Sequence, residues 1–141
     1  MTLADANGYL ALAERTHANL SHLADVAGPL EPGQTARDWL LTMHFYVIVA
    51  YVNALAATCG RRFADHGQRR DWIKSHPPLR SVASEYMALD GWSRDARYEG
   101  VVPRSLDDAH RSYRAVIEAV VPLLKAAGIR DAKSLPPVDF E

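Results

Sequence analysis

The 141-residue chain has little cysteine and almost no net charge, and each of these shortages excludes a class of protein. Cys59 is the single cysteine, so no disulfide can form within the chain, and we expect a reducing, cytoplasmic location. Basic residues number 16 and acidic residues 17, which gives a formal charge of -1. This balance excludes a basic field over the whole surface, so any site for a polyanion must be local.

Long apolar runs are also scarce. The longest extends from Phe45 to Cys59 and contains Asn53, and it is shorter than the roughly 20 residues that a membrane-spanning helix needs. We interpret it as a buried core helix and expect no membrane partner. The first residues lack the basic and apolar regions of a secretory signal peptide, so we do not expect secretion.

Strand patterns are missing, whereas helix-start signals recur. A Ser or Thr followed three residues later by Asp is typical of a helix start and occurs at Thr2, Thr35 and Ser105. Apolar residues at three- and four-residue steps predict four helices, over residues 2–27, 35–60, 77–90 and 105–128. A short helical turn is expected after Asp65. The short connections favour an all-α, antiparallel bundle of four to five helices.

The length of the chain fits one domain with a single core. Every predicted helix lies within residues 1–128, which we therefore expect to be that domain. Residues 129–141 contain two adjacent prolines and no helical pattern, and we expect them to form a C-terminal tail.

Most of the basic residues are arginine, since only three of the 16 are lysine. The planar guanidinium group is suited to bidentate contacts with phosphate or carboxylate groups. Positive charge is concentrated after the second predicted helix, in Arg61, Arg62, Arg69 and Arg70. We expect this stretch to contact RNA or a nucleotide, and the alternative is a solvated surface without a ligand.

A second polar stretch, SRDARY, follows the third predicted helix and contains Arg94, Arg97 and Tyr98. In one interpretation both arginines pair with carboxylates, such as those of Asp38 or Glu85, and fix a helix end. In the other, the arginines and the tyrosine bind a phosphate group. The sequence leaves both interpretations open.

Together with residues earlier in the chain, SRDARY resembles a pattern of the prokaryotic HEPN domain family. The resemblance covers roughly residues 15–100. Its matching residues are Asp38, Trp39, Thr42, Phe45, Tyr46, Ala54, His66, Arg69, Ser93, Arg94, Ala96, Arg97 and Tyr98. Two positions depart from the pattern, because its helical histidine falls on Ala50 and the glutamate after it falls on Asn53.

The resemblance implies a function as well as a fold. HEPN domains are four- or five-helix bundles that usually form dimers, and active members are metal-independent ribonucleases. The implied site is a cleft at the axis of a homodimer, where an Arg-x(4–6)-His motif from each subunit meets RNA without a cofactor. Histidine can move the proton of the 2′-hydroxyl, and arginine can stabilise the charge on the phosphorane oxygens.

Such an enzyme would leave 2′,3′-cyclic phosphate ends. The resemblance further implies a toxin or a defence effector, with an antitoxin or a nucleotidyltransferase as its partner. The alternative within the same fold is a non-catalytic module that binds a nucleotide, RNA or a partner protein. Ala50, in the place of the histidine, favours this alternative.

Spacing alone does not identify the Arg-x(4–6)-His motif, since about 1.7 matches are expected from the composition. Six pairs match: Arg15/His22, Arg37/His44, Arg61/His66, Arg69/His76, Arg70/His76 and Arg104/His110. The last pair begins the final predicted helix, where the family usually carries its motif and where free backbone N–H groups favour an anion. This pair supplies Arg104 and His110 as catalytic candidates. His66 and Arg97, which belong to the HEPN-like pattern, are the other two.

A further alternative is an unrelated bundle with a metal site built from three histidines, as in hydrolases of the DinB type. The available residues are His17, His22, His44 and His66. His17 and His22 are five residues apart, which rotates them to different faces of a helix. This alternative is the least favoured.

Overall fold

The computed structural model describes residues 3–27, 35–101 and 105–138, and of residues 26–27 and 35–38 only the backbone. This described part is all α-helical and contains no strand. Its α-helices are α1 (Leu3–Ala27), α2 (Thr35–Thr58), α3 (His66–Ser75), α4 (Ala83–Arg94) and α5 (Asp107–Ala126). A 3-10 helix, η1 (Pro77–Val82), precedes α4, and a π-helical turn, η2 (Asp95–Glu99), follows it. The predicted all-α bundle is confirmed.

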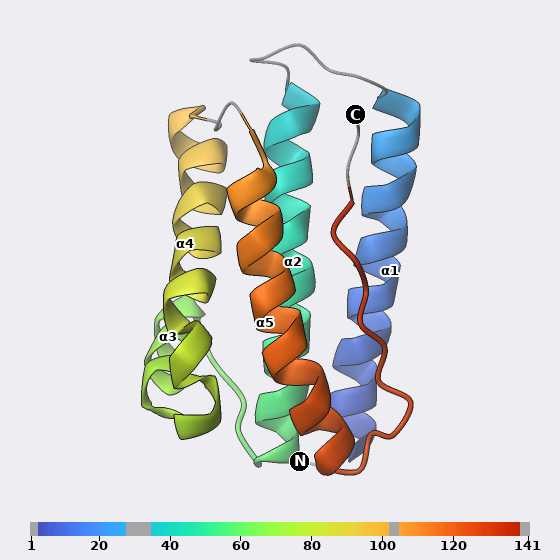
Figure 1. Ribbon diagram of the computed structural model, residues 1–141, viewed down its shortest axis with the longest axis vertical. Helices are drawn as coiled ribbons and strands as arrows, with labels where there is room; N and C mark the ends of the chain where they lie inside the picture. The colour runs from blue at the N-terminus through green and yellow to red at the C-terminus, as the bar shows by residue number, and fades with distance from the viewer. Residues whose placement is uncertain (1–2, 28–34, 102–104, 139–141) are drawn as a thin grey trace.

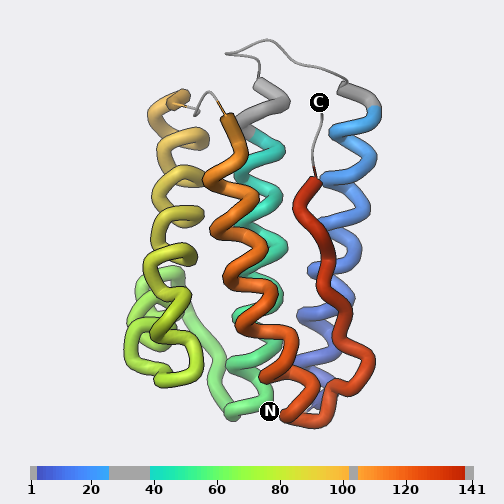
Figure 2. Tube along the Cα trace, viewed as in Figure 1, coloured from blue at the N-terminus to red at the C-terminus, as the bar shows by residue number. Residues whose placement is uncertain are grey.

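The four long helices run alternately up and down, and α2 is the central one (Figure 1). It packs against α1 along its length and also contacts α4 and α5. The short helix α3 lies beside η1, near the beginning of α4. After α5 the chain turns back as an extended segment that runs between α1 and α5 (Figure 2).

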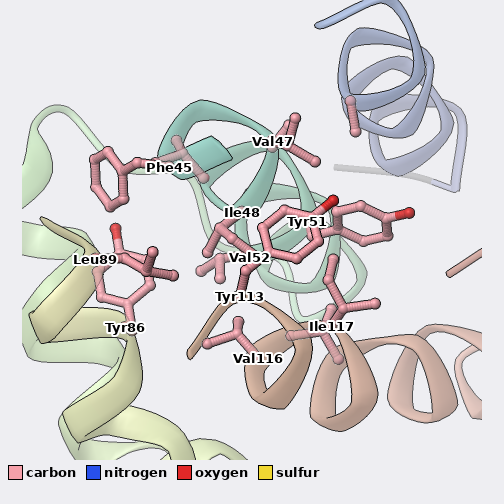
Figure 3. Close-up of a cluster of buried hydrophobic side chains, with 14 of the residues drawn as sticks. Phe45, Val47, Ile48, Tyr51, Val52, Tyr86, Leu89, Tyr113, Val116 and Ile117 are labelled. Atoms are coloured by element: carbon pink, nitrogen blue, oxygen red, sulfur yellow. The ribbon is translucent and has the colours of Figure 1, made fainter. Parts of the chain in front are cut away.

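The core is built around α2, whose apolar residues occur on all sides rather than on one face. Figure 3 shows Phe45 of α2 opposite Tyr86 of α4, while Tyr51 of α2 lies beside Tyr113 of α5. Residues Trp39–Thr58 are long and apolar enough to cross a membrane, but 78% of the window is buried within the bundle. A helix that neighbours cover on most sides needs such a composition, so the core accounts for it.

The short helix predicted after Asp65 is confirmed, and its start has a side-chain cap. Asp65 is the N-cap of α3, and its Oδ1 accepts a hydrogen bond of 2.8 Å from the backbone N–H of Gln68. Such a cap satisfies one of the N–H groups that have no partner within the helix. The cap therefore fixes where α3 begins, and with it the position of His66.

The predicted end of the third helix at Gly91 is wrong. The chain starts with the 3-10 turn at Pro77, becomes α-helical at Ala83 and continues through Gly91 into η2. Glycine costs a helix interior only about 1 kcal/mol, and the buried residues on both sides of Gly91 hold the helix in place. The turn ends at Gly100, whose φ of 65° is a left-handed conformation that favours glycine.

The other predicted helix starts have mixed outcomes. Ser105 lies one residue before Leu106, the N-cap of the last helix, and its Oγ accepts a hydrogen bond of 3.1 Å from the N–H of Asp107, so the predicted capping box does not form. Asp108 pairs with Arg111 at 3.1 Å instead of completing the predicted reciprocal cap. Thr2 lies outside the described residues, and so does the side chain of Thr35.

The importance of the α2–α4 contact can be measured with Leu89→Ala. Leu89 is fully buried, so the change should lower the free energy of unfolding by about 2–5 kcal/mol, through lost burial and the cavity left behind. Urea denaturation monitored by circular dichroism measures this loss. In the control Leu12→Ala, a side chain 44% exposed on α1 is removed, and the change should stay within about 0.5 kcal/mol. Equal effects of the two changes would contradict this description of the core.

Candidate functional site

The first two residues of the site are His66 and Arg69, which lie three residues apart on one face of α3. Nη1 of Arg69 donates a hydrogen bond of 2.8 Å to Nδ1 of His66. Nε of the same guanidinium group donates to Oδ1 of Asn53 on α2, at 2.9 Å. Because Arg69 is 7% exposed and both partners are neutral acceptors, these contacts bury its charge without neutralising it.

Guanidinium groups have no acceptor, so Nδ1 of His66 must accept from Arg69 and the neutral ring carries its proton on Nε2. Burial lowers the pKa of His66, and the nearby charge of Arg69 lowers it further. Arg97 and Arg70 act in the same direction, and Asp90 opposes them. At neutral pH the imidazole is therefore uncharged and presents an N–H donor at Nε2.

A buried carboxylate joins two further arginines. Asp90 of α4 is 3% exposed, and its Oδ2 accepts from Nη1 of Arg70 at 2.9 Å and from Nη2 of Arg94 at 3.2 Å. Removing one partner of a buried ion pair leaves an uncompensated charge, so all three groups depend on one another. The side chain of Arg94 is 53% exposed, which leaves much of its guanidinium group accessible to a ligand.

Arg97 lies between two exposed tyrosines. Its Nη1 donates a hydrogen bond of 3.0 Å to the hydroxyl of Tyr46, and its Cζ is 5.5 Å from the ring centroids of Tyr46 and Tyr98. Tyr46 is 40% exposed and Tyr98 is 75% exposed. A guanidinium group beside accessible aromatic rings can bind a phosphate and stack with a base at the same time.

These residues form one cluster, which we call the His66 site: His66, Arg69, Arg70, Asp90, Arg94 and Arg97. Two of its four guanidinium groups, those of Arg70 and Arg94, pair with the buried carboxylate of Asp90. Among the described residues, the partners of the other two are the neutral Asn53, Tyr46 and imidazole groups. Asp71 acts on Arg70 from the exposed side of α3. The interior of the cluster therefore has more positive than negative charge and can attract an anion.

Tyr86 places a buried hydroxyl group beside this cluster. The residue is 1% exposed, and its hydroxyl lies beside Arg69 without a hydrogen bond of good geometry. Burial raises its pKa to about 12, and the nearby Arg69 limits the increase. The hydroxyl therefore keeps its proton beside the buried guanidinium group.

The remaining predicted residues lie elsewhere. Arg61 and Arg62 are exposed between α2 and α3, and Arg62 lines a surface cavity of about 340 Å³ with Arg15. His110 is 8% exposed and packs against His44, with 5.1 Å between the ring centroids. Arg104 lies outside the described residues. Of the candidates from the sequence, the structure brings together His66, Arg69, Arg70, Arg94, Arg97 and Tyr98.

Among the described side chains, the carboxylate that pairs with SRDARY is Asp90, which was not named from the sequence. Arg94 pairs with Asp90, four residues earlier, whereas Glu85 accepts from Ser84 and the side chain of Asp38 is not described. The spacing of Asp90 and Arg94 on a helix was a signal that could have identified this pair.

Sequence reasoning also missed the roles of Tyr46, Asn53 and Tyr86. Tyr46 and Asn53 are seven residues apart, which places them on the same face of α2. That spacing was the available signal for the first two residues. Nothing local indicates that the hydroxyl of Tyr86 lies beside Arg69.

The histidines proposed for a metal site do not gather. His17 donates to the carbonyl oxygen of Pro136, and Nδ1 of His44 donates to that of Leu40. Among the described residues no group of three or more His, Cys, Asp or Glu side chains could hold a metal ion. The DinB-type alternative therefore has no support from these residues.

The pKa of His66 provides a test of this electrostatic arrangement. Histidine NMR titration should give a value below the ordinary 6.5. Arg97→Gln should raise it by removing a positive charge, and Asp90→Asn should lower it by removing a negative one. Equal shifts in the same direction would contradict the geometry.

The same lowered pKa links His66 to stability. The unfolded chain keeps the ordinary pKa, so it binds the proton first as the pH falls. His66 therefore does not reduce the free energy of unfolding above about pH 6.5, but it reduces that free energy progressively as the pH falls below this value. Urea denaturation at a series of pH values measures this loss, and in Arg97→Gln the loss should be smaller.

Comparison with known proteins does not assign the chain to a family. No family model matches its sequence, and no curated protein or solved structure matches it. The resemblance to HEPN domains therefore remains a hypothesis, and the properties of the His66 site must be judged from its own geometry.

Proposed function

We propose that this chain is a HEPN-like protein that binds RNA and holds a backbone phosphate at the His66 site. The observation that carries the proposal is the group of four arginines near His66, of which only Arg70 and Arg94 pair with the buried carboxylate of Asp90. In RNA-binding proteins such groups neutralise phosphates, and the affinity then depends strongly on salt. Because the overall charge is only -1, this contact must come from a local cluster.

The donors available to a phosphate lie on three elements. Arg70 of α3 and Arg94 of α4 keep partly exposed guanidinium groups, with side chains 32% and 53% exposed. Arg97 of η2 uses one nitrogen for Tyr46. His66 adds an Nε2–H donor. Arg69 has the role of a positioning residue, because it is buried and bound to Asn53 and His66.

Exposed aromatic residues favour RNA over an isolated anion. Trp39, Tyr46 and Asn53 follow one another at seven-residue steps on one face of α2, about 10 Å apart along the helix. Trp39 is 55% exposed, and Tyr98 adds a second ring beside Arg97. Unpaired bases of single-stranded RNA stack on such rings while the backbone contacts arginines.

Ribonuclease activity at the same site is the second candidate. It is favoured by the lowered pKa of His66, which keeps the imidazole neutral near pH 7, as a general base requires. However, Nδ1 accepts from Arg69 and Nε2 carries the proton, so Arg69 must release Nδ1 before His66 can accept a proton at Nε2. Cleavage needs this rearrangement and binding does not, so we propose RNA binding first and cleavage second. The homodimer and an antitoxin or nucleotidyltransferase partner remain predictions.

RNA binding can be tested by fluorescence anisotropy with a labelled single-stranded RNA of mixed sequence, over a series of salt concentrations. Arg94→Gln should weaken binding and reduce the salt slope by about 0.7, the value for one phosphate contact of a single strand. Asn53→Asp should weaken binding about three- to tenfold, because a carboxylate of the same shape would neutralise Arg69.

Arg114→Gln is the control for this experiment, since it removes an exposed cation from α5. It should leave the salt slope unchanged. An equal loss in Arg114→Gln, or no binding by folded protein at low salt, would contradict the proposed site.

Cleavage has a separate test, in which the purified protein is incubated with the same RNA in EDTA. If His66 is catalytic, products with 2′,3′-cyclic phosphate ends should form, and His66→Ala should abolish them while thermal unfolding stays cooperative. His110→Ala is the comparison, because its ring lies in the core beside His44. RNA that is bound but uncut at stoichiometric protein would exclude cleavage and leave the binding proposal intact.

A further inference from the structure

Residues 129–138, which we call the C-terminal segment, pack on the bundle as an extended chain between α1 and α5 (Figure 2). The segment begins after Gly128, whose φ of 109° allows the chain to reverse direction at the end of α5. Ile129 and Ala132 are 3% and 6% exposed, so the first part of the segment belongs to the core. The second part, residues 133–138, is held differently.

Two tyrosines bind the backbone of this second part. The hydroxyl of Tyr51, from α2, donates to the carbonyl oxygen of Lys133 and accepts from the N–H of Leu135 at 3.4 Å. The hydroxyl of Tyr113, from α5, donates to the carbonyl oxygen of Leu135 at 2.9 Å. Figure 3 shows the two rings side by side. Burial raises the pKa of both residues, that of Tyr51 to about 12, so both hydroxyls keep their protons.

Two histidines continue this pattern. Nε2 of His17, from α1, donates to the carbonyl oxygen of Pro136 at 2.7 Å. The N–H of Val138 donates to Nε2 of His44 at 2.9 Å, and Nδ1 of that ring donates to the carbonyl oxygen of Leu40. Together with the tyrosines they form what we call the docking site: His17, His44, Tyr51 and Tyr113.

The docking site contacts backbone groups of the C-terminal segment, and the two prolines determine which of these groups can donate a hydrogen bond. Pro136 and Pro137 have no N–H, so Leu135 and Val138 carry the only backbone donors of residues 135–138, and both are bound. The prolines also favour an extended chain at little entropic cost. Grooves lined by aromatic residues bind proline-rich peptides in this way.

The C-terminal segment does not fill the space around it. A cavity of about 200 Å³ lies between α5 and the segment, lined in part by Tyr113, Ile117 and Ser134. A second, of about 190 Å³, lies between α1 and the segment and includes Leu10 and Tyr51. A ligand with the same backbone pattern and a larger side chain in the place of Ser134 would bury more apolar surface.

We propose that the docking site binds an extended Leu-Pro-Pro-containing segment of a partner protein, and that the C-terminal segment occupies the site when the partner is absent. Backbone recognition explains how two different segments can share the site, and the unfilled cavity beside Ser134 gives the partner its advantage. The site is independent of the His66 site, because His44 and Tyr51 lie on the face of α2 opposite Tyr46 and Asn53.

The test uses the full chain with Leu135→Asp, which should release the second part of the C-terminal segment by placing a charge against the core. The probe is a fluorescein-labelled peptide with the sequence of residues 132–138, and binding is measured by anisotropy. The variant should bind it at least tenfold more tightly than the wild type, whose own segment competes. A second peptide with leucine in the place of Ser134 should bind about threefold more tightly still.

Tyr113→Phe in the Leu135→Asp background should weaken peptide binding roughly two- to twelvefold, as expected for one hydrogen bond. The matched control is Tyr9→Phe, which removes a hydroxyl from α1 outside the docking site and should have no effect. If the aspartate prevents folding, Leu135→Ala takes its place with the same readout.

Three results would overturn the proposal. The first is a folded variant in which the amide of Val138 exchanges rapidly with solvent but no peptide binds at millimolar concentration. The second is equal binding of both peptides together with no effect of Tyr113→Phe. The third is light scattering that gives a wild-type dimer which Tyr113→Phe dissociates, because the occupant would then be a second copy of this chain.

Discussion

The whole fold depends on the need to bury the apolar surface of α2. Most of its described side chains are buried, so α1, α4 and α5 pack around it and leave exposed the face that carries Trp39 and Tyr46. Even this cover is incomplete, and the C-terminal segment closes the remaining gap between α1 and α5. The polar groups of α2 can therefore lie only at its margins, where other elements provide their partners.

Those margins hold the two polar sites. On one side Tyr46 and Asn53 meet the arginines of α3 and η2. On the other, His44 and Tyr51 bind the backbone of the C-terminal segment. The first site holds more cationic than anionic groups among the described residues, which supports a ligand with negative charge. The second already has a ligand, and every described donor and acceptor in it is neutral.

Two residues of α2 show how its position in the bundle determines what a side chain can do. Ala50 is 2% exposed and packs in the core. Asn53 is a neutral acceptor for Arg69, so their hydrogen bond leaves the charge of Arg69 available to the field of the site. This charge strengthens the attraction for an anion.

The sequence by itself determined the helices, because apolar periodicity and cap residues act within a few positions of one another. It also singled out His66 and SRDARY, through their resemblance to the HEPN pattern and, for SRDARY, through its concentration of polar residues. Only the tertiary structure decided that Asp90 also pairs with Arg70 of another helix and that His110 is a core residue. It likewise showed that residues 129–138 pack on the bundle, whereas their prolines and lack of a helical pattern had predicted a C-terminal tail. These outcomes depend on contacts between residues far apart in the chain, where the cost of burying a polar group selects its partner.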